Sequence, residues 1–280
     1  MAARRRVALV SCASSGIGQA VSRALVAAGF DVVGADRGGA VVDPGGDVGV
    51  DGLDVTKGAS ITTLVERVVE RFGWIDVLVN TAVVGSERPL SSGARAQCDL
   101  DSNLLSLVRM TQAVLPFMRS QRSGRIINLP SIAGLVDGPY LAAERASRQL
   151  VEGYSTAVDH EVRQDGVRVL VVVPGASGDG SRLGRTTAVT CATDDARPLE
   201  GKRRRITEQG AASLQADRPL ALIARAVVTA ATTPDPRPRY AAAIPGGRLE
   251  ALALSRVAPA QIRAPHMFDA PVRKYNQLPG

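Results

Sequence analysis

Two groups of residues in this sequence have the types and spacing that chemistry requires. The first is a Ser/Gly-rich turn at residues 11–18, which follows an apolar run and precedes a stretch with helical periodicity. Backbone N–H groups at such a helix N-terminus, with the positive end of the helix dipole, favour a phosphate group. The second is Glu144 and Arg148, a carboxylate and a guanidinium four residues apart in a predicted helix. On one helix face they can pair, which lowers the pKa of the carboxyl group.

Asp36 lies about 20 residues after the turn, at the end of the second predicted strand. A carboxylate there can accept hydrogen bonds from both hydroxyls of an adenosine ribose and repels a 2′-phosphate. Arg37 follows at once and partly offsets that repulsion. These residues predict a site for NAD or NADP, with NAD favoured. A simple tight turn and a turn-forming acid are the structural alternatives.

Apolar, β-branched runs alternate with stretches of helical periodicity along the chain. The predicted strands are residues 7–10, 31–35, 48–55, 75–79, 125–129, 167–173 and 239–244. The predicted helices are residues 17–28, 60–72, 100–118, 141–162 and 221–231. Apolar strands separated by helices form a parallel sheet that is covered on both faces. We therefore predict an α/β fold with a doubly wound, Rossmann-like parallel sheet, whose ligands bind at the carboxyl ends of the strands.

One domain accounts for most of the chain in this interpretation, from residue 1 to residue 257. The stretch from about 176 to 215 is polar and has little periodicity, which is typical of a lid or substrate-binding loop. A disordered insertion is the alternative. Residues 258–280 contain several prolines and are predicted to form a C-terminal tail.

The composition excludes several classes of protein. The net charge is +7, but the basic residues are scattered, so we expect no nucleic-acid partner. Cys12, Cys98 and Cys191 are far apart and lack metal-ligand spacing, so neither a disulfide framework nor a metal site is predicted. No apolar run reaches the roughly 18 residues that span a bilayer, and the first residues lack the apolar core of a signal peptide. We expect a cytoplasmic protein.

Motifs in order along residues 5–250 resemble those of the short-chain dehydrogenase/reductase family. Residues 11–18 resemble its glycine motif, residues 53–56 its adenine-contacting segment, and residues 80–83 its Asn-Asn-Ala-Gly motif. The resemblance implies cofactor-binding roles for Ser11, Ser14, Ser15, Gly16, Ile17, Gly18, Asp36, Arg37, Asp54, Val55, Asn80, Ala82, Arg148, Pro174 and Gly175. Cys12 stands where the family has its first glycine.

The resemblance also implies catalytic roles. Asn103 falls on the family's catalytic asparagine, and Ser131 on its catalytic serine. The spacing from the serine puts Glu144 on the family's tyrosine and Arg148 on its lysine. In the family, the tyrosine transfers the proton at the carbonyl oxygen and the lysine holds the nicotinamide ribose. Tyr140 is the nearest substitute for the missing phenol.

Three functions are consistent with these replacements. In the first, the crevice binds a small molecule, and Glu144 with Ser131 performs acid–base chemistry without net redox, such as isomerisation, cyclisation, aldol-type chemistry or elimination. In the second, the protein is an ordinary NAD(P)-dependent ketoreductase that uses Tyr140 or water. In the third, it is a non-catalytic binding or partner subunit in which Glu144 and Arg148 form a structural ion pair.

The resemblance extends to partners. Residues 237–240 and the chain beyond are similar to the subgroup that acts on steroids, retinoids and other large apolar molecules, which implies an apolar, polycyclic substrate. The predicted helices at 100–118 and 141–162 resemble those that pair in family dimers and tetramers. A homodimer or homotetramer is therefore expected.

Overall fold

The computed structural model describes residues 4–36, 53–81, 101–130, 142–174 and 219–242; the side chains of residues 102, 142–144, 174 and 219 are outside this description. The strands are β1 (Arg6–Ser11), β2 (Phe30–Ala35), β3 (Val77–Asn80), β4 (Gly124–Asn128), β5 (Val167–Pro174) and β6 (Arg239–Ala242). The α-helices are α1 (Gly16–Ala27), α2 (Gly58–Phe72), α4 (Ser106–Gln121), α5 (Ala142–Val162) and α7 (Pro219–Thr232). A π-helical turn, η1 (Asp101–Leu105), precedes α4, and a 3₁₀ turn, η3 (Arg163–Asp165), follows α5.

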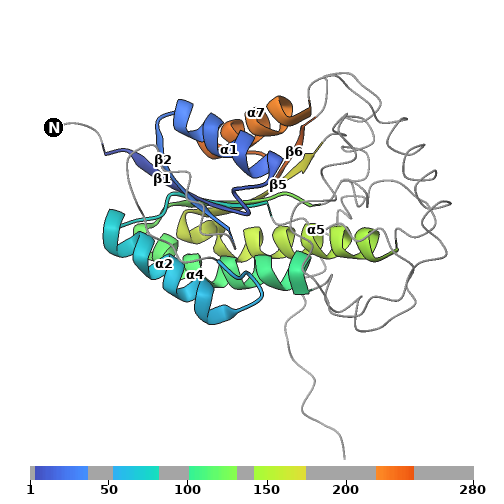
Figure 1. Ribbon diagram of the computed structural model, residues 1–280, viewed down its shortest axis with the longest axis horizontal. Coiled ribbons are helices and arrows are strands. Elements are labelled where there is room, and N and C mark those ends of the chain that lie inside the picture. Colours follow the sequence, from blue (N-terminus) through green and yellow to red (C-terminus); the bar gives the residue numbers. More distant parts are fainter. Residues whose placement is uncertain (1–3, 37–52, 82–100, 131–141, 175–218, 243–280) are drawn as a thin grey trace, which may run out of the picture.

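The six strands form one parallel sheet in the order β2-β1-β3-β4-β5-β6. Helices α1 and α7 cover one face, and α2, α4 and α5 cover the other (Figure 1). This arrangement confirms the predicted doubly wound α/β fold. In the described part of the chain, no helix is both long and apolar enough to cross a membrane.

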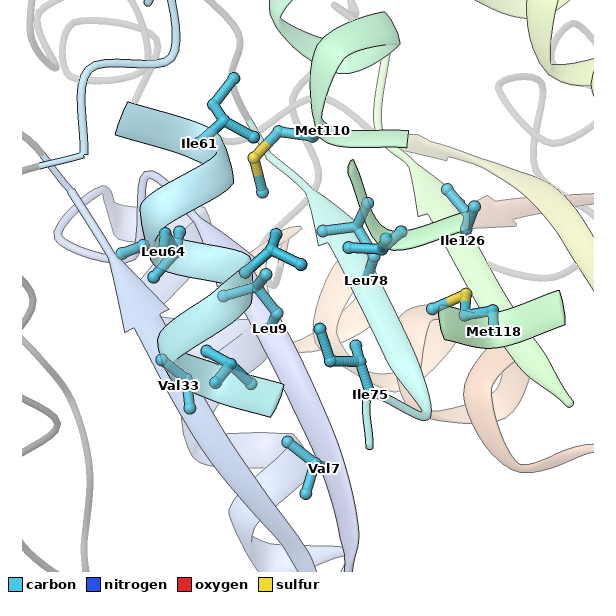
Figure 2. Close-up of a cluster of buried hydrophobic side chains, with 14 of the residues drawn as sticks. Val7, Leu9, Val33, Ile61, Leu64, Ile75, Leu78, Met110, Met118 and Ile126 are labelled. Atoms are coloured by element: carbon cyan, nitrogen blue, oxygen red, sulfur yellow. The ribbon is translucent and has the colours of Figure 1, made fainter. Parts of the chain in front are cut away.

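Two apolar layers hold the sheet between its helices. Figure 2 shows the layer beneath α2 and α4, where Leu9 and Leu78 of the sheet face Ile61 and Leu64 of α2 and Met110 of α4. The layer on the other face contains Val10, Val79 and Leu170 together with residues of α1 and α7. Strands that are buried on both faces explain the unbroken apolar runs in the sequence.

One predicted strand is wrong over the part that is described. Residues 48–52 of the predicted strand 48–55 lie outside the described residues, and residues 53–55 are not in a strand. Asp54 accepts hydrogen bonds from the Thr56 N–H (3.0 Å) and hydroxyl (2.6 Å), which makes an Asx turn. Turn chemistry overrides the apolar pattern here, because the carboxylate satisfies the backbone locally.

Other boundaries differ slightly from the predictions. The predicted helix 100–118 begins, where described, as the π-helical turn η1, and α4 continues to Gln121. Residues 243–244 of the last predicted strand, the loop 176–215 and the tail 258–280 lie outside the described residues. The division of the chain at residue 257 therefore stays a proposal.

Asp159 joins the end of α5 to the start of β5. Its carboxylate accepts hydrogen bonds from Arg163 (2.6 Å), Arg168 (2.9 Å) and the Val169 N–H (2.9 Å), and the residue is 1% exposed. Burial by itself raises the pKa of Asp159, but the hydrogen bonds from Arg168, Val169 and Arg163 outweigh it and hold the pKa below its ordinary value.

We expect Asp159→Asn to lower the free energy of unfolding by about 3 kcal/mol at neutral pH, because it removes the buried partner of two arginines. Since the folded-state pKa is depressed, the stabilisation is complete above the unfolded-state pKa of about 3.9 and is lost as the pH falls through the folded-state pKa. Urea unfolding across this pH range measures the difference between the variant and the wild type.

The matched control is Asp165→Asn, since Asp165 pairs with Arg119 (2.9 Å) on a more exposed part of the surface. Its effect is expected to stay below about 1 kcal/mol. Equal losses from both variants would contradict the role given to the buried cluster.

Candidate functional site

The sheet order places a topological switch point at the carboxyl ends of β1 and β3. The chain leaves β1 through α1 to reach β2 on one side, whereas α2 leads to β3 on the other side. The loops at such a switch point separate and leave room for a ligand. Residues 12–15 after β1, Asp36 after β2 and Thr81 after β3 all lie at this edge.

The turn after β1 ends in a capped helix. Ser15 is the N-cap of α1, and its hydroxyl accepts a hydrogen bond from the Gly18 N–H (2.9 Å). A Cβ atom on Gly18 would lie 2.8 Å from Cα of Ala13 and would overlap the carbonyl oxygen of Cys12. Only glycine allows the helix to approach the turn this closely, which is the packing role expected for the last glycine of a dinucleotide turn.

Cys12 adopts a backbone conformation that favours glycine. Its φ is 49°, in the left-handed region, and its carbonyl accepts the Ser15 N–H (3.0 Å) to close the turn. A side chain in this conformation costs about 1–2 kcal/mol. The turn thus has, at Cys12, a backbone conformation that suits the glycine which the family carries at this position.

Ser11, predicted to bind cofactor, has a buried side chain. It is 1% exposed, and its hydroxyl accepts a hydrogen bond from the Thr81 N–H (3.1 Å). The Thr81 hydroxyl in turn donates to the Ser11 carbonyl. This pair joins β1 to the residue after β3. Within the same predicted motif, Ile17 is 5% exposed and belongs to the core, whereas Gly16 is exposed.

Asp36 connects β2 to the turn after β1. One carboxylate oxygen accepts hydrogen bonds from the Ser14 N–H (3.1 Å) and from the Ser14 hydroxyl, and the residue is 6% exposed. The Asp36 carbonyl accepts the Leu53 N–H (2.9 Å), which brings Asp54 to the same edge. Val55 is in the core. The structure thus brings three predicted cofactor residues, Ser14, Asp36 and Asp54, to one edge.

A buried amide chain lies between the sheet and α5. Asn80 donates to Asn128 (2.8 Å), Asn128 donates to Ser155 (2.9 Å), and Ser155 donates to the Val151 carbonyl (2.6 Å). The side-chain oxygen of Asn80, Oδ1, has no hydrogen-bond partner among the described residues. The side chain of Asn80 thus links β3, β4 and α5, and its predicted role in cofactor binding stays a prediction.

Sequence analysis gave no role to Asn128 or Ser155 in this chain of hydrogen bonds. The only signal was that Asn128 ends an otherwise apolar strand, where a buried amide needs partners.

Asn103 lies in the π-helical turn η1 and is 7% exposed. Turns of this kind often occur at functional sites, because the extra residue changes the direction of the backbone. Helix α5, which carries Arg148, packs against η1. The fold therefore places the turn of Asn103 beside the helix that carries Arg148, and their common site stays a prediction.

Arg148 is buried and paired. Its side chain is 2% exposed, and its Nη2 lies 2.7 Å from a carboxylate oxygen of Glu152, one turn further along α5. The other Glu152 oxygen lies 2.7 Å from Nη1 of Arg239 on β6. Sequence analysis assigned no charge role to Glu152 or Arg239, and the i,i+4 spacing from Arg148 to Glu152 was the signal that could have found the first pair.

Several predicted site residues lie outside the described residues: Arg37, Ala82, Ser131, Tyr140 and Gly175. Glu144 belongs to α5 and Pro174 ends β5, but their side chains are outside the description as well. In the described ranges, no group of three or more His, Cys, Asp or Glu side chains has the arrangement of a metal site.

A single parallel sheet with a capped, glycine-containing turn at its switch point is typical of the doubly wound α/β class. Residues 6–178 match the short chain dehydrogenase family, and the chain belongs to that family.

Comparison with individual proteins agrees with this membership. The chain is 34% identical over 180 residues to a 3-ketodihydrosphingosine reductase of Bacteroides thetaiotaomicron, covering 62% of this chain and 65% of that protein, slightly less than two thirds of its length. A short-chain dehydrogenase from Streptomyces avermitilis has a TM-score of 0.71 at 27% identity, over 91% of this chain and 93% of that one. A metagenomic short-chain oxidoreductase in complex with NADP has a TM-score of 0.63 at 26% identity, over 84% and 96%.

The left-handed conformation of Cys12 yields a stability prediction. We expect Cys12→Gly and Cys12→Val to differ by about 2 kcal/mol in the free energy of unfolding, with the glycine variant more stable, because a β-branched residue is the least suited to a positive φ. Thermal or urea unfolding of both variants measures this. Variants of equal stability would show that the turn relaxes without strain.

Proposed function

We propose that the chain binds a nicotinamide dinucleotide at the carboxyl ends of β1, β2 and β3. The convergence of the capped turn, Asp36 and Asp54 on this edge is the observation that supports the proposal. The pyrophosphate lies at the N-terminus of α1, and Asp36 faces the adenosine ribose. A bound nicotinamide accepts or supplies a hydride in ordinary members of the family.

The proposed catalytic group is Glu144, which takes the place of the family's tyrosine. It is the third residue of α5. An ionised carboxylate is a base at neutral pH and cannot donate a proton as a phenol does. The neighbouring family position is held by Arg148, and a guanidinium keeps its proton in proteins. Arg148 therefore cannot pass on a proton.

The resulting chemistry is acid–base work without net redox on an apolar, polycyclic small molecule. Glu144 removes a proton from carbon next to a carbonyl group, and the Ser131 hydroxyl donates a hydrogen bond to the enolate oxygen while Asn103 orders the site. Where the substrate carries a β,γ C=C double bond, the enolate is a dienolate; returning the proton to its γ-carbon moves the double bond and completes an isomerisation, and no electrons leave the substrate. Cyclisation, aldol-type and elimination steps use the same base.

A second candidate is an NAD(P)-dependent ketoreductase that uses Tyr140 as its acid. The observation in its favour is that the chain resembles a protein named as a reductase and another solved with NADP. In both candidates the protein acts as a homodimer or homotetramer. The exposed Leu105 and Leu150, on η1 and α5, support pairing through these helices.

Glu144→Gln separates the two candidates. We expect a 10²–10⁴-fold loss of turnover measured without added nicotinamide cofactor, because the variant has no base. A pooled metabolite screen with and without NAD identifies the substrate for this assay. Tyr140→Phe is the matched control and is expected to leave that turnover within about twofold.

The opposite pattern would overturn the first candidate. Reduction that requires NADH or NADPH, survives Glu144→Gln and disappears in Tyr140→Phe would establish the ketoreductase. Activity in neither assay together with a partner captured in a pull-down would establish a non-catalytic binding subunit.

Asp36 sets the proposed preference for NAD. We expect Asp36→Ala to shift the ratio of NAD to NADP affinity by about tenfold toward NADP, because the carboxylate no longer repels a 2′-phosphate. Fluorescence titration with NADH and NADPH measures both affinities. Ser14→Ala controls for the lost hydrogen bonds to the turn, and a shift of the same size in that variant would contradict direct recognition by Asp36.

A further inference from the structure

Glu152 bridges two arginines in the interior of the protein. Its two carboxylate oxygens each lie 2.7 Å from a guanidinium nitrogen, one of Arg148 and one of Arg239. The three side chains are 2%, 14% and 9% exposed for Arg148, Glu152 and Arg239. Ion pairs at this burial interact much more strongly than surface pairs, and removal of one partner leaves a charge without compensation.

The bridge connects distant parts of the fold. Arg239 begins β6 and is paired in register with Val171 of β5. Arg148 lies one helical turn before Glu152 on α5, the helix that packs against the turn of Asn103. The two ion pairs therefore connect β6, through Glu152, to the guanidinium of Arg148, which is predicted to lie at the cofactor edge.

Arginine needs such a restraint more than most residues. Its side chain has many rotamers, and its planar fork recognises a partner only from defined directions. The contact with Glu152 brings opposite charges within 2.7 Å without hydrogen-bond geometry, so it is their attraction that limits the rotamers of Arg148.

We propose that Glu152 is a positioning residue for Arg148, and that Arg239 holds Glu152 in place for this task. This inference rests on the proposed function, in which Arg148 contacts the ribose of the nicotinamide half of the cofactor. Glu152 touches no reacting atom in this scheme. It sets the geometry of the guanidinium and thereby the affinity for the nicotinamide half of the dinucleotide, while the adenosine half binds independently at Ser14 and Asp36.

A second carboxylate on the same helix provides a matched control. Asp159 also forms ion pairs with two arginines: Arg163, four residues later in the chain, and Arg168 on β5. It lies about two turns further along α5, against the start of β5 and away from the carboxyl edge of the sheet. Asp159→Asn therefore removes a similar buried bridge without touching Arg148.

The experiment measures affinity for NADH and for ADP by titration in the full chain. Glu152→Gln is expected to weaken NADH binding about tenfold and to leave ADP binding within twofold, whereas Glu152→Asp retains part of the NADH affinity. Arg148→Ala should weaken NADH to a similar extent, and the double variant should be no weaker than Arg148→Ala alone, since the two act as one unit. Asp159→Asn should reduce the unfolding midpoint without changing either affinity.

A readout without cofactor separates this inference from the proposed function. In protein labelled with ¹⁵Nε-arginine, the Arg148 signal, assigned by its loss in Arg148→Lys, should show slow guanidinium rotation that Glu152→Gln abolishes and Asp159→Asn preserves. Unchanged rotation in Glu152→Gln, or NADH affinity within twofold of wild type in that variant while Arg148→Ala weakens it, overturns the positioning role. Restrained rotation together with NADH affinity that Arg148→Ala leaves unchanged overturns the cofactor role instead.

Discussion

Parallel pairing of β1 with both β2 and β3 is the constraint on which the site depends. The two neighbouring strands are reached through helices on opposite faces, α1 on one and α2 on the other (Figure 1). The turn at residues 12–15 therefore lies at the switch point of the sheet, at the carboxyl end of β1. The apolar layers on both faces hold the strands in register, so the position of this edge follows from burial rather than from any polar contact.

Polar contacts then fix the turn, the strand ends and α5 at the edge that the apolar layers position. Gly18 permits α1 to lie against the Cys12 carbonyl, and the Ser15 cap satisfies one of the N–H groups that the first turn leaves unpaired. The Asn80–Asn128 contact and its continuation to Ser155 couple two strand ends to α5. A buried amide network has few alternative arrangements, which makes this edge of the sheet rigid.

Helix α5 is held to the sheet by two carboxylates of similar arrangement. Asp159 joins it to β5, and Glu152 joins it to β6 through Arg239. Each carboxylate also takes an arginine of the helix or its end as a second partner. Charges this deeply buried add little net stability. They exclude other placements of the helix, because any shift would separate the buried charges of an ion pair. Glu144 and Arg148, which take the positions of the family's tyrosine and lysine in the prediction, lie on this helix.

Sequence alone determined the fold class and most elements of the sheet, because hydrophobic periodicity and turn chemistry are local properties of the chain. The turn at residues 11–18, Asp36 and Asn80 could be picked out as motifs of the family for the same reason. Tertiary structure decided the rest. Spacing makes Glu152 a possible partner of Arg148, and the fold adds Arg239, 87 residues away in sequence, as a second partner of that carboxylate. The turn at Asp54, the π-helical start before α4 and the inward role of Asn80 were likewise set by neighbours that only folding supplies, since a buried polar group takes whichever partner the packed chain presents.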